Sequence, residues 1–216
     1  MRLIDLSQPV FDRCPNCPAH PPARSRLIAN HPGDDWRMEH LEMTSHTGSH
    51  LDAPLHKLAG GKSIDAFPLE RFVGPALIVD CRDARPSQAL DAEYLDRRLP
   101  EKIDGLFVLL ATGWGRQRAA DDLWLYHSPY LSPKGASWLV ERGVPLVGID
   151  HYSIGGSGED NVLCHEILLG NEVIVVEELR FPEEVFSLPQ PVEFWALPVN
   201  LPGHSGAFCR PILHLP

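Results

Sequence analysis

The sequence predicts an α/β protein, and three features of the chain support this prediction. The chain has 216 residues, 44% of them hydrophobic, which is enough to bury one core without disulfides or a structural metal. Short, strongly apolar runs recur along the chain, and amphipathic helical patterns separate them in its middle part. We therefore expect a single domain, residues 1–216, formed around a mixed sheet.

Six apolar runs have the composition of buried strands, because they are rich in Val, Ile, Leu and aromatic residues. Most of them are too apolar to be half-exposed, so they should lie inside the sheet. They are LIDL near Ile4, ALIVD ending at Asp80, GLFVLLAT ending at Thr112, VPLVGID ending at Asp150, EVIVVEEL around Val175 and VEFWALPV around Trp195.

Three segments predict helices. In SPKGASWLVERG, Ser132 is a suitable N-cap, Pro133 suits the first helical position and Gly143 follows the expected end. DAEYLDRRL, from Asp91, is the second segment, and LCHEILLGN, closed by Gly170, is the third. The 21 prolines are spread along the chain, which indicates short elements joined by tight loops.

The charge balance limits the classes of partner. Asp and Glu outnumber Lys and Arg by 29 to 19, for a formal charge of −10, and no basic stripe could follow a phosphate backbone. No window approaches the roughly 18 uninterrupted apolar residues of a membrane span, and no charged leader precedes an apolar run. We expect a cytoplasmic protein with a small-molecule substrate, no nucleic-acid partner and no membrane partner.

The five cysteines are an odd number scattered along the chain, which favours a reducing compartment. Cys14 and Cys17 form a C-x-x-C pair. However, no second ligand pair lies nearby, as a zinc knuckle requires, and the proline-rich surroundings lack the strand and helix of a redox motif. We expect free thiols.

The segment HTGSHLDAPLH, which begins at His46, concentrates three of the chain's 11 histidines and one aspartate. His46, His50, Asp52 and His56 all occupy even positions. In an extended chain their side chains would therefore project to one side, about 6 to 7 Å apart for neighbours two residues on. A bent loop would bring them closer still.

These residue types are suitable ligands for a transition metal. Imidazole and carboxylate together suit divalent zinc, manganese or iron, whereas an all-oxygen set would suit calcium or magnesium. Three protein ligands with an open position are typical of catalytic zinc, because structural sites close all four positions, usually with cysteine. A single histidine is commonly an ordinary loop residue bonded to backbone, but the cluster favours a metal site.

HTGSHLDAPLH matches the signature H-x-G-[ST]-H-x-D-x-P-x-H, and the chain resembles the cyclase family of metal-dependent hydrolases, which includes bacterial kynurenine formamidases and isatin hydrolases. The resemblance extends over nearly the whole chain and implies a swivelling β/β/α fold assembled as a homodimer or homotetramer. The further matching motifs are DLSQPV at the start, ATGW at Trp114, GIDHYSI at Asp150, HEILLGNEVIVVEEL from His165 and LPGHSGAFCRPIL at the end.

The resemblance implies a site with two divalent metal ions per chain, zinc or manganese. It implies that His46, His50 and Asp52 bind the first ion. Asp52 would bridge to a second ion, which His165 and Glu177 complete.

His56 corresponds to the family's catalytic histidine, which lies close to the metals without being a ligand. From the residues alone, two neighbours stay open as alternatives. Glu178 follows Glu177 and would face the opposite way in a strand, and Glu166 follows His165.

The implied activity is hydrolysis of an amide-type C–N bond in a small aromatic substrate. N-formylkynurenine is the leading candidate, and a cyclic amide such as isatin is the next. We expect Trp114 and Phe67 to form an apolar wall beside the metals. The chain departs from the family in the segment CPNCPAHP, where many formamidases have P-x-W-P-G-D: Cys17 replaces the tryptophan, and Ala19 and His20 replace Gly and Asp.

The sequence argues against two other classes of function. A serine hydrolase needs the motif G-x-S-x-G, but here Gly155 and Ser157 are followed by Glu159. Ser49 stands among the metal ligands and is expected to orient a ligand rather than attack substrate. The second alternative is a metal- or small-molecule-binding protein without turnover; His56 argues against it, because such a protein needs no extra proton carrier there.

Overall fold

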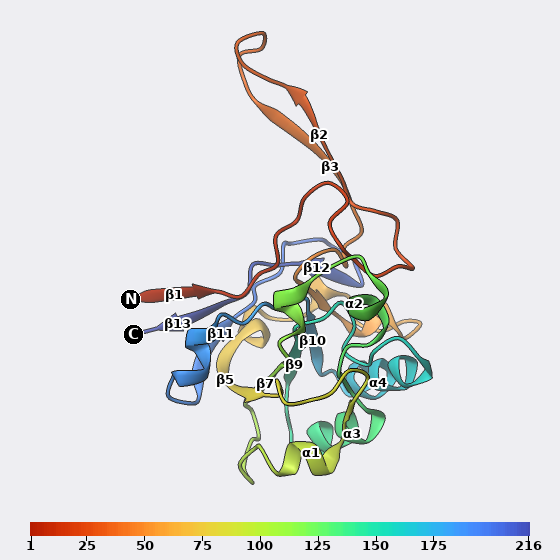
Figure 1. Cartoon of the computed structure of the whole chain (residues 1–216), viewed down its shortest axis with the longest axis vertical. Helices are drawn as coiled ribbons and strands as arrows, with labels where there is room; N and C mark the ends of the chain where they lie inside the picture. The colour runs from red at the N-terminus through yellow and green to blue at the C-terminus, as the bar shows by residue number, and fades with distance from the viewer.

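A nine-stranded sheet forms the centre of the computed structural model, which describes residues 1–216 (Figure 1). Strands β5, β7, β9 and β10 are parallel neighbours, and the other pairs are antiparallel. The predicted α/β class with a mixed sheet is therefore confirmed. From edge to edge the strands are β1 (Arg2–Asp5), β13 (Ile212–Leu215), β11 (Val192–Trp195), β5 (Val73–Asp80), β7 (Phe107–Ala111), β9 (Leu146–Ile149), β10 (Ile174–Glu177), β4 (His50–Asp52) and β12 (Gly206–Phe208).

Each of the six predicted runs forms a strand of this sheet: β1, β5, β7, β9, β10 and β11. Every residue of β7, β9 and β10 is buried, as their continuous apolar composition predicts for central parallel strands. The short strands β4, β12 and β13 were not predicted. β4 has only 3 residues and carries a histidine and an aspartate, so local propensity gives no signal, and its pairing with β10 and β12 holds it in the sheet.

Three helices lie together beside one face of the sheet (Figure 1). Ser132 caps α3 as predicted, by accepting a hydrogen bond from the backbone N–H of Gly135 at 3.1 Å. The helix that carries His165 begins earlier than predicted, at Glu159, because two acidic residues in its first turn suit the positive end of a helix. The helices are α1 (Ala92–Asp96), α3 (Pro133–Glu141) and α4 (Glu159–Gly170); a short fourth, α2 (Asp122–Tyr126), precedes α3 in the chain.

The sheet separates two apolar cores. In β7, Val108 and Leu110 pack in the core that includes the helices, whereas Phe107 and Leu109 pack in the core on the opposite face. Because α4 is packed on this sheet through residues such as Leu168, its position relative to β10 is fixed. No helix of the structure combines the length and the apolar character that crossing a bilayer requires.

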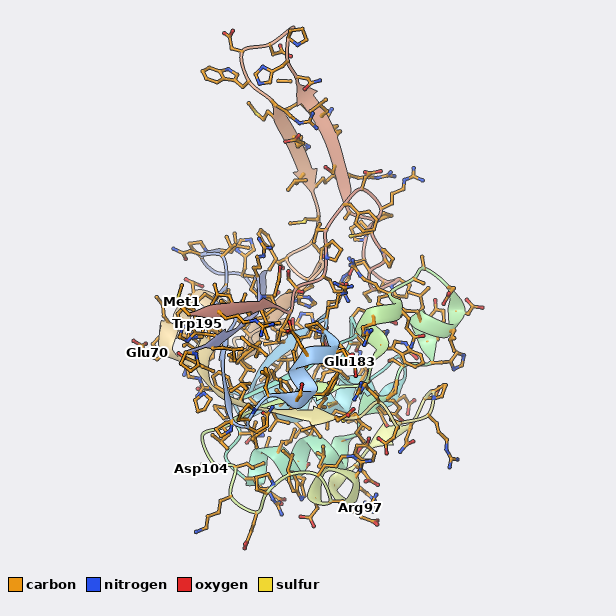
Figure 2. The ribbon with its side chains drawn as sticks, turned by 60° about the vertical axis from the view of Figure 1, so that its left-hand side comes forward. Met1, Glu70, Arg97, Asp104, Glu183 and Trp195 are labelled. Carbon is orange, nitrogen blue, oxygen red and sulfur yellow. The ribbon has the colours of Figure 1, made fainter.

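A two-stranded ribbon projects away from the body of the protein (Figure 1). It consists of β2 (Arg24–Ala29), β3 (Met38–Glu42) and the turn that joins them, and we call it the arm. The arm was not predicted. Every residue of β3 is exposed, and Figure 2 shows the arm's side chains extending into solvent. A two-stranded ribbon is only marginally stable by itself in water, so the arm is a candidate contact surface.

Asp150, directly after β9, connects the end of β9 to the end of β7 through hydrogen bonds. Its Oδ1 accepts hydrogen bonds from the Thr112 backbone N–H at 2.9 Å and the Thr112 hydroxyl at 2.6 Å, and its Oδ2 accepts from the Gly113 backbone N–H at 2.8 Å. The carboxyl group is 1% exposed, and burial raises its pKa above the ordinary value although these donors oppose the shift.

Asp150→Ala should lower the free energy of unfolding by about 3 kcal/mol, because it leaves several buried donors without an acceptor. Urea denaturation followed by circular dichroism measures this change. Asp96→Ala is the control, since the exposed Asp96 only pairs with Arg142 at 3.5 Å, and its effect should be several times smaller. Equal effects of the two variants would contradict the assigned role of Asp150.

Candidate metal centre

The centre of the site is built on the antiparallel pair β4 and β10. Their register places His50 opposite Glu177. His50 and Asp52 are two residues apart in β4, so their side chains project to the same face, as predicted for an extended chain. His50 Nε2 consequently lies 3.4 Å from Glu177 Oε2 and 3.4 Å from Asp52 Oδ1.

Helix α4 adds a second imidazole to this pair of strands. His165 Nε2 lies 3.5 Å from Asp52 Oδ2 and 3.3 Å from Glu177 Oε1. Each of the two carboxylates therefore touches both imidazoles. We call His50, Asp52, His165 and Glu177 the inner quartet; all four are buried, with at most 6% of their surface exposed.

Backbone carbonyls determine which ring nitrogen of each imidazole is available. His50 Nδ1 lies 2.7 Å from the Gly48 carbonyl, and His165 Nδ1 lies 2.8 Å from the Asn161 carbonyl. Because a carbonyl can only accept, each Nδ1 carries the hydrogen and each neutral ring presents a bare Nε2. These lone pairs face the carboxylate oxygens, an arrangement that only a cation or a proton between them can stabilise.

The electrostatics of the inner quartet favour positive charge at its centre. Burial alone lowers the pKa of His50, but Glu177 and Asp52 raise it to about 9. Burial likewise lowers the pKa of His165, which the same two carboxylates raise to about 10. Burial alone raises the pKa of Asp52, but His165 and His46 hold it well below its ordinary value.

The spacing of the inner quartet fits a divalent metal ion. Four ligands at 2.0–2.2 Å around a tetrahedral ion are separated from one another by roughly 3.3 to 3.6 Å. The four imidazole-to-carboxylate distances of the quartet are 3.4, 3.4, 3.5 and 3.3 Å. In addition, the buried Asp52 Oδ2 has no hydrogen-bond partner. The residues present can therefore hold a divalent ion.

His46 lies beside this quartet and differs from its histidines. Its Nδ1 is 2.7 Å from Asp52 Oδ1 and its Nε2 is 3.0 Å from the Ser205 hydroxyl, so both ring nitrogens have side-chain partners. Side-chain nitrogen and oxygen atoms of His46, Asp52 and His56 that could hold a metal ion also lie within 4.8 Å of one another. Asp52 thus belongs to two potential ligand groups, an arrangement suited to the predicted bridging role.

His56 is exposed at the opening of the site. It ends the 3-10 helix η1 (Pro54–His56), and its ring centroid lies 4.2 Å from that of His46 and 5.8 Å from that of His165. His46 and His56 lie in a turn and in a 3-10 helix, so the segment is extended only at β4 and bends on both sides of it, as the bent-loop alternative predicts. Partial desolvation lowers the pKa of His56, and Asp52 only partly opposes this.

The structure distinguishes Glu177 from Glu178 and Glu166, the two neighbouring carboxylates that the sequence allowed as alternatives. Glu178 follows the end of β10 with a φ of 53°, turns away from the quartet and pairs with Arg118 at 2.6 Å. Burial raises the pKa of Glu178 to about 7, against the effect of Arg118. Glu166 pairs with Lys57 at 3.5 Å near the surface. Glu177 alone of these three carboxylates faces the imidazoles.

Trp114 and Phe67, which were predicted to form one aromatic wall, lie in two different apolar clusters. Trp114 is buried in a cluster with Trp124 and Tyr152, against which Cys17 packs. Phe67 belongs to the core on the face of the sheet opposite the helices, and it borders a surface cavity of about 420 Å³ that none of the six predicted metal-site residues lines. Roles of Trp114 and Phe67 in substrate binding stay predictions.

The two serines considered as nucleophiles have other partners. The Ser49 hydroxyl donates to the Glu178 carbonyl at 2.6 Å and accepts from the Gln8 backbone N–H at 2.8 Å. The Ser157 hydroxyl donates to the Tyr126 carbonyl at 3.3 Å. Ser49 therefore fixes the backbone beside the metal ligands, and neither serine is bonded to a histidine.

Two contributors to the site were not found from the sequence. The hydroxyl of Ser205, next to β12, forms a hydrogen bond with His46. Gly206 has no side chain, so the His46 ring can lie close to its backbone. A Cβ added at Gly206 would lie 2.6 Å from His46 Cε1 and would also clash with the Leu51 carbonyl. A glycine that follows a serine gives no signal of such a close approach, which depends on the pairing of β12 with β4.

Gly206→Ala should displace His46 and β4 and weaken metal binding by about 10- to 100-fold, as loss of a supporting contact commonly does. Competition with a fluorescent chelator measures the affinity. Gly170→Ala is the control, because no atom lies within 4 Å of a Cβ added there. Unchanged affinity in the Gly206 variant would show that the placement of His46 is irrelevant to the metal.

Comparison with known proteins identifies the family of the chain. The family model described as "Putative cyclase" matches residues 4–155. The chain is 31% identical over 197 residues to the kynurenine formamidase of Bordetella petrii, covering 87% of this chain and 90% of that one. It is 30% identical over 218 residues to the kynurenine formamidase of Salinibacter ruber, covering 99% and 97%.

Among solved structures, isatin hydrolase A from Labrenzia aggregata is similar with a TM-score of 0.83 and 25% identity, over 98% of this chain and 93% of that one. The family match therefore covers more than half of the chain, and both the curated relatives and the fold extend over most of it. The resemblance predicted from the signature is confirmed: the chain belongs to the cyclase family.

Proposed function

We propose that the protein is a metal-dependent hydrolase that cleaves an amide-type C–N bond of a small aromatic substrate. The observation that carries this proposal is the inner quartet, a buried set of two imidazoles and two carboxylates with metal-ligand spacing, next to the exposed imidazole of His56. N-formylkynurenine is the leading substrate, because the relatives with this name cover nearly the whole chain.

The reaction needs a metal ion, a proton carrier and an open position for substrate. A bound divalent ion supplies Lewis acidity, which lowers the pKa of water toward about 7 and polarises a carbonyl. His50, Asp52, His165 and Glu177 would hold the ion. His56 is neutral near pH 7 because its pKa is lowered, so it accepts a proton from the attacking water and donates it to the leaving nitrogen.

Zinc and manganese both accept this ligand set, and availability decides between them as much as affinity does. We propose two ions per chain that share Asp52, because Asp52 contacts His46 as well as His50 and His165. Five cysteines without disulfides suit the cytoplasm, where we place the enzyme.

A cyclic amide such as isatin is the second candidate substrate. The similarity in fold to an isatin hydrolase over 98% of the chain favours it, and ring opening of a cyclic amide requires the same bond cleavage. The alternative class is a binding protein without turnover. The effect of replacing His56 distinguishes the enzyme from such a binding protein, because only the enzyme needs a proton carrier.

His56→Ala should lower kcat by about 10² to 10⁴ while metal content stays unchanged, because the variant loses the proton carrier and no ligand. Turnover of N-formylkynurenine and elemental analysis measure the two quantities. His214→Ala is a matched control, since His214 lies on β13 and pairs with Glu193 far along the sheet from the quartet.

Loss of metal from the His56 variant would instead identify His56 as a ligand. Removal of metal with a chelator should abolish turnover in both the native enzyme and the control. If the metal-loaded native enzyme cleaves neither N-formylkynurenine nor isatin, the binding-protein alternative is correct.

We also propose a homodimer or homotetramer in which the arm contacts another copy of the chain. The arm exposes large apolar side chains that a lone ribbon cannot bury: Leu27, Ile28, Trp36, Met38 and Leu41 are each 47 to 68% exposed. β2 also carries Arg24 and Arg26, and β3 also carries Glu39 and Glu42. Such a surface is typical of an interaction site.

Replacing Leu27, Trp36 and Leu41 together by serine should convert the assembly to monomers, because it removes the apolar surface available for contact. Light scattering after size-exclusion chromatography measures the mass. Leu69→Ser is the control, since Leu69 is 63% exposed on the body of the protein. An unchanged oligomer in the triple variant would exclude the arm from the interface.

A further inference from the structure

A buried ion pair lies next to the metal ligands. Arg118 Nη2 is 2.6 Å from Glu178 Oε2, and the two side chains are only 6% and 1% exposed. In every other pair of an arginine or lysine with a carboxylate, at least one side chain is well exposed. Taking both charges out of water is costly, so this pair needs an explanation.

Glu178 also has a backbone conformation that its residue type disfavours. Its φ of 53° lies in the left-handed region, which favours glycine. The Glu178 N–H donates to the His151 carbonyl at 2.8 Å, and the Glu178 carbonyl accepts from the Ser49 hydroxyl at 2.6 Å. A glycine could make both bonds without strain, so they do not explain why a glutamate occupies this position.

The ion pair is incompletely bonded. Glu178 Oε1 and Oε2 and Arg118 Nε are buried and make no hydrogen bond, whereas a buried pair offsets its desolvation only when such bonds complete it. The other Arg118 nitrogens donate to backbone carbonyls of the segment that precedes the arm, Pro9 at 2.7 Å and Pro15 at 2.5 Å. A strained and incompletely bonded pair indicates a role other than stability.

The contacts of Glu178 extend to metal ligands on both strands of the site. Ser49, which donates to the Glu178 carbonyl, directly precedes His50. Strand β10 ends at Glu177, so the conformation of Glu178 sets the direction in which the chain leaves the strand. A different conformation there would rotate the Glu177 carboxylate relative to the two imidazoles. Arg118 opposes such a change, because it is bonded to a separate segment of the chain.

We propose that Arg118 and Glu178 are positioning residues of the metal centre. Their ion pair holds Glu178 in its left-handed conformation and thereby directs the Glu177 carboxylate toward the two imidazoles of the inner quartet. The pair is retained for this placement at the expense of stability. The proposal rests on the proposed metal binding and not on the identity of the substrate.

The double variant Arg118→Met/Glu178→Met separates placement from stability. Methionine is an unbranched side chain of similar length, so the variant removes the charges and keeps most of the volume. Its free energy of unfolding in urea, measured without metal, should equal or exceed the native value, because apolar replacement of a buried pair is commonly neutral or stabilising. Its affinity for zinc, measured by competition with a fluorescent chelator, should nevertheless fall by about 10- to 100-fold.

Two single variants and a control extend this comparison. Arg118→Met should lose zinc affinity to the same extent and also be destabilised, because an unpaired buried carboxylate remains. Arg118→Lys keeps a positive charge beside Glu178 and should retain most of the affinity. Arg97→Met is the control, since Arg97 pairs with Glu93 beside α1 and both side chains are more than half exposed. It should bind zinc as the native protein does.

Crystal structures of the metal-free native protein and of the double variant give a readout that requires no metal binding. The native Glu177 carboxylate should stay 3.4 Å from His50 Nε2 and 3.3 Å from His165 Nε2. In the double variant it should lose contact with at least one imidazole. An unmoved carboxylate, or native zinc affinity in the double variant, would overturn the proposal. A native protein that binds no divalent ion would contradict the proposed function instead, and the two crystal structures would still decide the role of the pair.

Discussion

The antiparallel pairing of β4 with β10 is the constraint on which the candidate site depends. It places His50 opposite Glu177, and the two-residue repeat of a strand places Asp52 on the same face. A shift of one residue would turn these side chains to the opposite core. The apolar strands β7, β9 and β10 fix the frame of the sheet, and α4, packed on it, delivers His165 to the same point.

This arrangement concentrates polar and charged groups in a region that is buried from solvent. Two carboxylates and two imidazoles, each at most 6% exposed, would be costly to bury without compensating charge. The imidazoles have their Nδ1 atoms bound to carbonyls and can turn only Nε2 toward the acids. A divalent ion satisfies all four groups at once, which explains why a fold with ample apolar core retains them. His56 lies outside this set and is exposed.

Local patterns made six of the nine strands of the main sheet, α3 and the four residues His46, His50, Asp52 and His56 predictable, because each depends on neighbours in sequence. His165 and Glu177 followed only from the family resemblance, since strand register and helix packing bring them to β4. The left-handed φ of 53° at Glu178, which turns that carboxylate away, has no local signature. β4 was missed because three residues that include a histidine and an aspartate have little strand propensity. The place of His20 beside His46 depends on a loop fastened by Arg118, from a distant part of the chain.

The central claim is that the inner quartet binds a divalent metal ion. Anomalous diffraction from crystals grown with zinc, and separately with manganese, tests it most directly. The account predicts an anomalous peak about 2.0 to 2.2 Å from His50 Nε2, His165 Nε2 and oxygens of Asp52 and Glu177, with a second peak that shares Asp52. Metal-loaded crystals with no peak within the quartet, or with the ion bound elsewhere, would contradict it.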